Sequence, residues 1–75
     1  MDIEVRLREL ESRYRGALSA TVAAKANYLA LASESSATRA AIERAKARWQ
    51  QLDANKRAIA VQMGELEDFE STPAA

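Results

Sequence analysis

Ser33-Glu34-Ser35-Ser36 is the weakest part of a heptad pattern that otherwise runs through most of this 75-residue chain. Apolar residues recur at alternating three- and four-residue steps, which form one stripe along an α-helix. One set of heptad positions is Ile3, Leu10, Ala17, Ala24, Leu31, Thr38, Ala45, Leu52, Ile59 and Leu66, and the other is Leu7, Tyr14, Thr21, Tyr28, Ser35, Ile42, Trp49, Lys56, Met63 and Glu70. The pattern therefore predicts an all-α protein.

Two architectures use such a stripe. In the first, one continuous helix of about 100 Å zips to a copy of itself as a parallel coiled coil. In the second, a turn at about residues 33–36 joins two antiparallel helices at about 2–32 and 37–70. Serine favours helix starts because its hydroxyl accepts a hydrogen bond from a free backbone N–H group. We therefore expect Ser33, Ser35 or Ser36 to cap the second helix of a hairpin.

Side-chain sizes favour the hairpin. If the numbers of facing residues sum to about 73, Trp49 lies opposite Ala24 and Lys56 lies opposite Ala17, so that large groups meet small ones. In a parallel dimer Lys56 would face Lys56, and a buried pair of like charges is costly. We therefore predict one antiparallel hairpin over residues 1–70, with the continuous parallel coiled coil as the alternative and 71–75 as a disordered tail.

The composition argues against catalysis and against bound cofactors. The chain has no histidine and no cysteine, so it lacks the usual zinc ligands and cannot form a Ser-His-Asp triad. It also has no glycine-rich phosphate loop, and two helices leave little room to enclose a pocket. We expect no enzymatic activity, no metal, no cofactor and no small-molecule substrate.

The charge balance argues against a nucleic acid or a membrane as the partner. Eleven basic residues balance eleven acidic ones, so there is no broad attraction to nucleic acid or to an anionic membrane. The most apolar window, 17–32, is too short to span a bilayer and contains Lys25. Residues 2–15 are too densely charged for a signal peptide, and the lack of cysteine fits a reducing compartment. We therefore expect a cytoplasmic location.

A second apolar row beside the main stripe predicts association. Leu18, Val22 and Leu29 lie about a quarter-turn or more from the stripe, and only Lys25 interrupts them. A helix that is apolar on more than one face usually contacts more than one neighbour. We expect a homo-oligomer, most simply two hairpins in a four-helix bundle, or docking onto the helices of another protein.

Other residues are candidates for contacts with a partner. Trp49, the single tryptophan, belongs to the core by its heptad position and could also anchor an interface. Phe69 points away from the stripe and is a further candidate contact. Along one flank of the second helix, Arg39, Lys46 and Arg57 form a possible basic patch for an acidic partner or a nucleic acid, or else a solvated helix face.

Around Trp49-Gln50 and Ala58-Ile59-Ala60-Val61 the second half resembles the small co-chaperones of type III secretion needle proteins. The resemblance implies a short helical hairpin that pairs with a second chaperone and holds the needle subunit soluble. Our leading hypothesis is thus a non-catalytic interaction module, either a small chaperone or an adaptor, acting through an apolar helical face. The alternatives are a small nucleic-acid-binding four-helix dimer and a structural coiled-coil rod.

Overall fold

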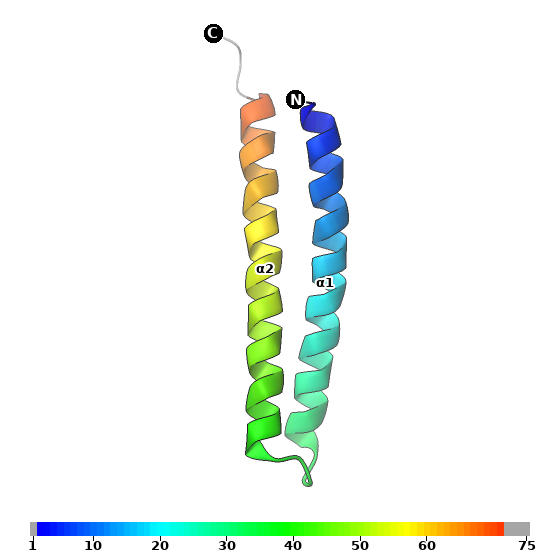
Figure 1. The fold of residues 1–75 in the computed structure, drawn as a ribbon, viewed down its shortest axis with the longest axis vertical. Coiled ribbons are helices and arrows are strands. Elements are labelled where there is room, and N and C mark those ends of the chain that lie inside the picture. The colour runs from blue at the N-terminus through cyan, green and yellow to red at the C-terminus, as the bar shows by residue number, and fades with distance from the viewer. Residues whose placement is uncertain (1, 72–75) are drawn as a thin grey trace.

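Two helices make up the protein in the computed structural model, which describes the backbone of residues 2–71 and the side chains of residues 2–68. Helix α1 spans Ile3–Ser33 and helix α2 spans Arg39–Ser71. They lie side by side and antiparallel, so that the described chain begins and ends at the same pole (Figure 1). The hairpin measures 62 × 18 × 15 Å, whereas a continuous helix would extend about 100 Å. The predicted all-α hairpin is confirmed, and the alternative of one continuous rod is wrong.

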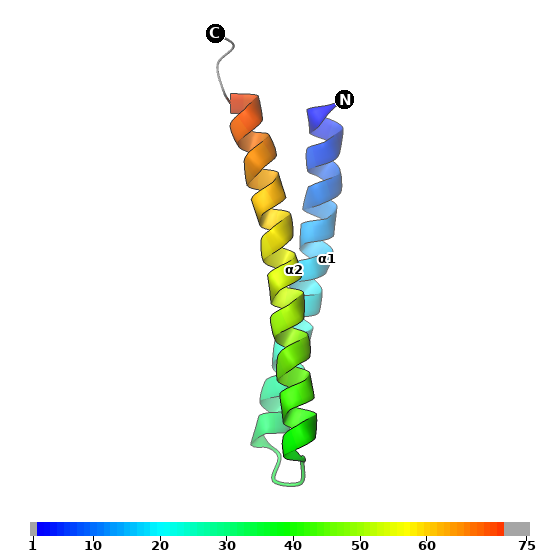
Figure 2. The same ribbon diagram turned by 60° about the vertical axis from the view of Figure 1, so that its left-hand side comes forward.

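The two helices cross at a shallow angle, as the rotated view in Figure 2 shows. This is the geometry in which the heptad positions of two helices interdigitate along their whole length. It explains why apolar residues recur every seven residues within each of the two helices. A single stripe on each helix is enough to keep the pair together.

Helix α1 begins at a conventional cap. Asp2 has an extended backbone, and its Oδ1 accepts a hydrogen bond from the Glu4 N–H at 3.0 Å. The Arg6 N–H donates to the Asp2 carbonyl at 3.1 Å. Negative side chains at Asp2 and Glu4 also interact favourably with the positive end of the helix dipole. The first turn is therefore specified locally, by residues that precede the heptad stripe or lie beside it.

Helix α1 ends without a glycine. Glu34 leaves the helix in an extended conformation, with φ −85° and ψ 126°, and its N–H donates to the Leu31 carbonyl at 3.1 Å. The Ser33 hydroxyl donates to the carbonyls of Leu29 and Ala30, both at 3.0 Å. These bonds satisfy carbonyls that the helix end would leave free. Ser33 thus closes α1 rather than opening α2.

Thr38 caps helix α2. Its Oγ1 accepts a hydrogen bond from the Ala41 N–H at 3.1 Å, and its carbonyl accepts from the Ile42 N–H at 3.1 Å. The prediction that Ser33, Ser35 or Ser36 would cap this helix is wrong. The reason is that the connection runs over residues 34–38 and not 33–36, which brings Thr38 to the position where an oxygen acceptor is needed. At the other end, Ser71 is the last residue of α2, so only 72–75 of the expected tail lie outside the described residues.

Few side chains of the hairpin are well buried, and most of those are small, whereas the larger residues of the stripe are mainly half-buried. Leu10, 1% exposed, is the one large apolar side chain that is fully buried among the described residues, and the other buried apolar residues are Ala17, Ala24 and Ala45. Thr21 is buried too, and its hydroxyl donates to the Ala17 carbonyl at 2.7 Å, so no buried oxygen is left unpaired there. Because alanine buries little surface, such a core contributes little stability.

Candidate partner interface

Three large aliphatic side chains project from one side of α1. Leu18 is 40% exposed, Val22 60% and Leu29 53%. Their spacings of four and seven residues place them on one side of the helix, beside the buried row that contains Ala17 and Ala24. We call these three residues the aliphatic ridge. The ridge lies outside the contact between α1 and α2 and remains open to a partner.

Lys25 interrupts the aliphatic ridge, but the hairpin holds its charge at Trp49. The Lys25 Nζ lies 5.5 Å from the centroid of the Trp49 ring on α2, a distance at which the cation is attracted to the ring electrons. A long lysine side chain can cover apolar surface with its methylene groups while its ammonium lies elsewhere. At this level the ridge therefore presents mainly the Lys25 stem.

Trp49 has one part in the core and one at the surface. Its ring stacks on Tyr28, with centroids 5.7 Å apart and planes 12° apart, while the residue as a whole is half-buried. It also lines a shallow hollow on α2, together with Gln50, Asp53, Ala54 and Arg57. The expected register set Trp49 opposite Ala24. The ring in fact stacks one turn further along the same stripe of α1.

Two of the three cations in the possible basic patch are paired with carboxylates. Arg39 Nε lies 3.3 Å from Glu43 Oε1, and Arg57 Nε lies 3.0 Å from Asp53 Oδ2. Lys46 is exposed and has no ion-pair partner among residues 2–68. The neighbouring carboxylates offset much of the positive field that a polyanion would need.

Asp53 also neutralises the lysine in the heptad stripe. Lys56 Nζ lies 3.1 Å from Asp53 Oδ1, and both side chains are largely shielded from solvent. The pair forms between residues three apart on α2, so α1 does not supply the counter-ion. This local pairing explains how a lysine occupies a stripe position inside a hairpin.

Small residues line a groove along another flank of the hairpin. Two adjoining hollows of about 410 and 310 Å³ share Ala20 and Leu52. On α1 they are bordered by Gly16, Ala23 and Asn27 among others. The sequence reasoning missed this groove, although small residues at positions 16, 20, 23 and 27 repeat at helical spacing. We call it the alanine groove.

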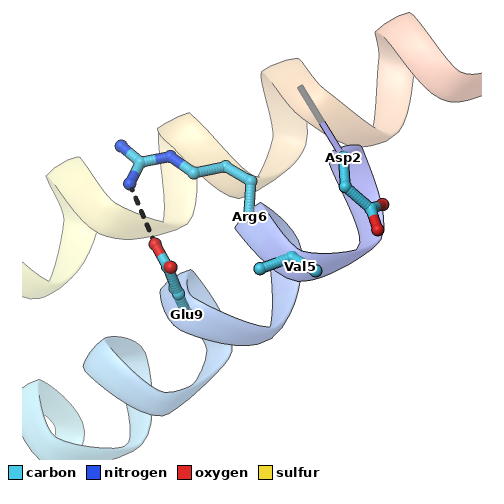
Figure 3. Close-up of a pocket in the computed structure, with 4 residues that line it drawn as sticks. All are labelled: Asp2, Val5, Arg6 and Glu9. Atoms are coloured by element: carbon cyan, nitrogen blue, oxygen red, sulfur yellow. Dashed lines mark hydrogen bonds and ion pairs between the residues drawn. The ribbon is translucent and has the colours of Figure 1, made fainter.

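A further hollow, of about 440 Å³, lies at the open end of the hairpin and is lined by Asp2, Val5, Arg6 and Glu9 (Figure 3). Its polar groups already have partners within α1. Arg6 Nη1 lies 3.4 Å from Glu9 Oε2, and the Asp2 carboxylate caps the helix start. Val5 is 47% exposed. The arrangement stabilises the first turns of the helix.

The remaining interface candidate, Phe69, has its side chain outside the described residues. Neither helix contains, over its described part, a stretch long and apolar enough to cross a membrane. No protein-family model, curated protein or solved structure matches this chain.

Proposed function

We propose that this chain is a non-catalytic protein–protein interaction module that acts as a small cytoplasmic chaperone or adaptor. The observation that carries the proposal is the exposure of Leu18, Val22 and Leu29 on one side of α1. A row of exposed large aliphatic residues on one face is typical of a surface that binds another protein. The partner would be helical, because a straight ridge on a helix fits best against the groove of a second helix.

The size of the interior supports the same proposal. A buried core of one leucine, three alanines and a threonine gives a short hairpin little hydrophobic stabilisation. Each ridge residue is already partly covered, so burying the rest contributes on the order of 1 kcal/mol per side chain. Summed over the ridge, this is a substantial part of the about 5–15 kcal/mol by which folded domains are stable. Docking would therefore stabilise the fold as well as the complex.

The most specific form of the proposal follows from the resemblance to type III secretion co-chaperones at Trp49-Gln50 and Ala58-Ile59-Ala60-Val61. In that form the hairpin pairs with a second helical chaperone and keeps an aggregation-prone subunit soluble. The aliphatic ridge is the surface that such a role would use. The general proposal rests on the ridge alone and stands without the resemblance.

A pair of matched double substitutions tests the proposal. Leu18→Glu with Leu29→Glu places two charges on the ridge, whereas Ser19→Glu with Ala26→Glu places two charges at exposed positions of the same helix outside the ridge. We expect the ridge variant to lose association, measured by sedimentation and by the amount of any stoichiometric partner bound to the purified hairpin. The control variant should keep it, and circular dichroism should show helices in both.

The proposal fails if the two variants behave alike. A ridge variant that retains the sedimentation mass and the bound partner of the unmodified chain would show that contacts are made elsewhere on the hairpin. A ridge variant that loses its helices would be replaced by Leu18→Ser with Leu29→Ser, which removes the apolar groups without adding charge.

A further inference from the structure

We infer that the aliphatic ridge binds a second copy of this chain, with the two α1 helices antiparallel and a twofold axis between Val22 and Lys25. This inference rests on the proposed function and names its partner. In the pair, Leu18 of each copy packs against Leu29 of the other. Val22 of each copy packs against the methylene stem of Lys25 of the other.

The spacing of the ridge is self-complementary. The midpoint between Leu18 and Leu29 along α1 coincides with the midpoint between Val22 and Lys25. A twofold interface requires this property, since residue i must contact j while j contacts i. The antiparallel pair therefore buries both leucines of each copy in one register, without a change in either helix.

Two other alignments of the ridge bring like charges together. A parallel pair would set Lys25 opposite Lys25. An antiparallel pair shifted so that Leu18 faces Val22 would set Lys25 opposite Arg15. Opposed like charges in an interface are costly and select against the wrong alignment. In the proposed register the two Lys25 side chains lie near the axis, but each ammonium is held at 5.5 Å from the Trp49 ring centroid of its own copy.

Opposite charges meet at the two ends of the overlap. When Val22 faces Lys25, Arg15 of one copy comes level with the end of α1 in the other, where Glu34 carries an exposed carboxylate. Neither Arg15 nor Glu34 has an ion-pair partner among the described side chains of its own hairpin. The twofold axis repeats the contact, so the dimer gains two such pairs. Complementary charges at the rim fix the register.

The hairpin exposes more surface than a compact protein of its mass. The chain has an accessible surface of 5706 Å², whereas a compact monomer of 8.2 kDa is expected to have about 4,500 Å². The excess is larger than the about 800 Å² that each partner buries in a standard interface. Burying surface along α1 would reduce this excess in each copy.

Single cysteine substitutions test the geometry cleanly, because the chain has no native cysteine. Two copies of Val22→Cys would lie about 4–5 Å apart along the helix axis, close enough to link under mild oxidation. Two copies of Leu18→Cys would lie about 16 Å apart along the axis and should stay unlinked. A mixture of Leu18→Cys and Leu29→Cys chains should link to each other. Ala23→Cys, exposed at the level of Val22 but bordering the alanine groove, is the matched control.

We expect most of the Val22→Cys chain and of the Leu18→Cys/Leu29→Cys mixture to form linked dimers, with Ala23→Cys and Leu18→Cys alone near background. If the Leu18→Cys chain linked to itself and the Val22→Cys chain did so too, the two α1 helices would be parallel and the inference would be overturned. Linking of Ala23→Cys in place of Val22→Cys would move the interface to the alanine groove and overturn it too. A monomeric mass with no linking would also overturn it. The proposed function would not fall with it, because the Leu18→Glu/Leu29→Glu variant would still test whether the ridge binds a different protein.

Discussion

Tyr28 and Trp49 stack across the hairpin, with ring centroids 5.7 Å apart and planes inclined by 12°. The stack joins α1 and α2 in the half of the hairpin that is nearer the turn. Because the buried residues nearby, Ala24 and Ala45, are small, the two larger rings add apolar contact area between the helices at this end. Lys25 adds its cation to the same ring.

Replacing Trp49 with alanine should destabilise the hairpin strongly. We expect a loss of about 2–4 kcal/mol in the free energy of unfolding, toward the lower part of the range for buried aromatic residues because the ring is half-buried. A double-mutant cycle with Tyr28→Ala should give a coupling of about 0.5–1.5 kcal/mol. Urea denaturation followed by circular dichroism measures both quantities. A coupling near zero would mean that the stack does not form in solution.

Replacing Thr38 with alanine should cost about 1 kcal/mol, since Oγ1 accepts the Ala41 N–H at the start of α2. The serines of the connection serve as controls. Ser35→Ala and Ser36→Ala remove hydroxyl groups for which no helix-capping contact is present, so each should change stability by less than about 0.5 kcal/mol. Chemical denaturation of the three variants in parallel decides the matter. Equal losses at 36 and 38 would contradict the assignment of the cap.

Leu10→Ala should lower the stability more than any other single truncation in the N-terminal half of α1. Leu10 is fully buried, and deleting such a side chain typically costs about 2–5 kcal/mol. Val61→Ala, at an exposed position of α2, should leave stability within about 0.5 kcal/mol. Thermal melts at one protein concentration provide the comparison. If both variants melted together, Leu10 would not be in the core.

Reversing the charge at Arg15 should weaken self-association, and reversing Glu34 as well should restore it. Exposed ion pairs contribute about 0.2–1 kcal/mol each, and the twofold axis doubles the effect, so Arg15→Glu should raise the dimer Kd by roughly 2- to 30-fold. The double variant Arg15→Glu/Glu34→Arg should return close to the original value. Both effects should shrink at about 1 M salt, where screening is strong. Sedimentation equilibrium at two salt concentrations measures this, and a double variant weaker than the single would exclude the contact.

Nucleic acid should bind weakly at most. Arg39 and Arg57 are paired with Glu43 and Asp53, and eleven acidic residues balance the eleven basic ones, so the net positive field available to phosphates is weak. We expect no retention of duplex DNA or single-stranded RNA in a gel-shift assay at about 0.15 M salt. A tight complex that dissociates steeply as salt rises would instead favour the nucleic-acid-binding alternative.

The heptad pattern and the size matching of Trp49 and Lys56 were enough to predict the hairpin, because two helices with one stripe each have few ways to pack. The cap at Thr38 could not be predicted, because a heptad pattern indicates where helices pack but not the residue at which a helix begins. Thr38 occupies a stripe position inside the predicted helix of about 37–70, and only the observed turn shows that its oxygen accepts a hydrogen bond from the Ala41 N–H at the start of α2. Residue numbering also cannot show how far a long side chain extends along a helix, which is why Trp49 was expected opposite Ala24 but stacks on Tyr28.

The same limit applies to the candidate interface. Periodicity placed Leu18, Val22 and Leu29 on one side of α1, and the structure shows how exposed each of them is. The sequence pattern could not show that the Lys25 ammonium lies over Trp49, because that contact depends on the rotamers of both side chains. Nor could it show that Arg39 and Arg57 are paired with acids of their own helix.

The small number of well-buried apolar side chains also sets how this protein responds to temperature. The heat-capacity change on unfolding grows with the apolar surface that becomes hydrated, and in ordinary domains it is about 12–15 cal/mol/K per residue. A hairpin whose buried apolar residues, among the described side chains, are one leucine and three alanines should fall below that range. Its stability curve would then be broad and shallow, so that cooling would weaken the fold less than it weakens proteins with larger apolar cores.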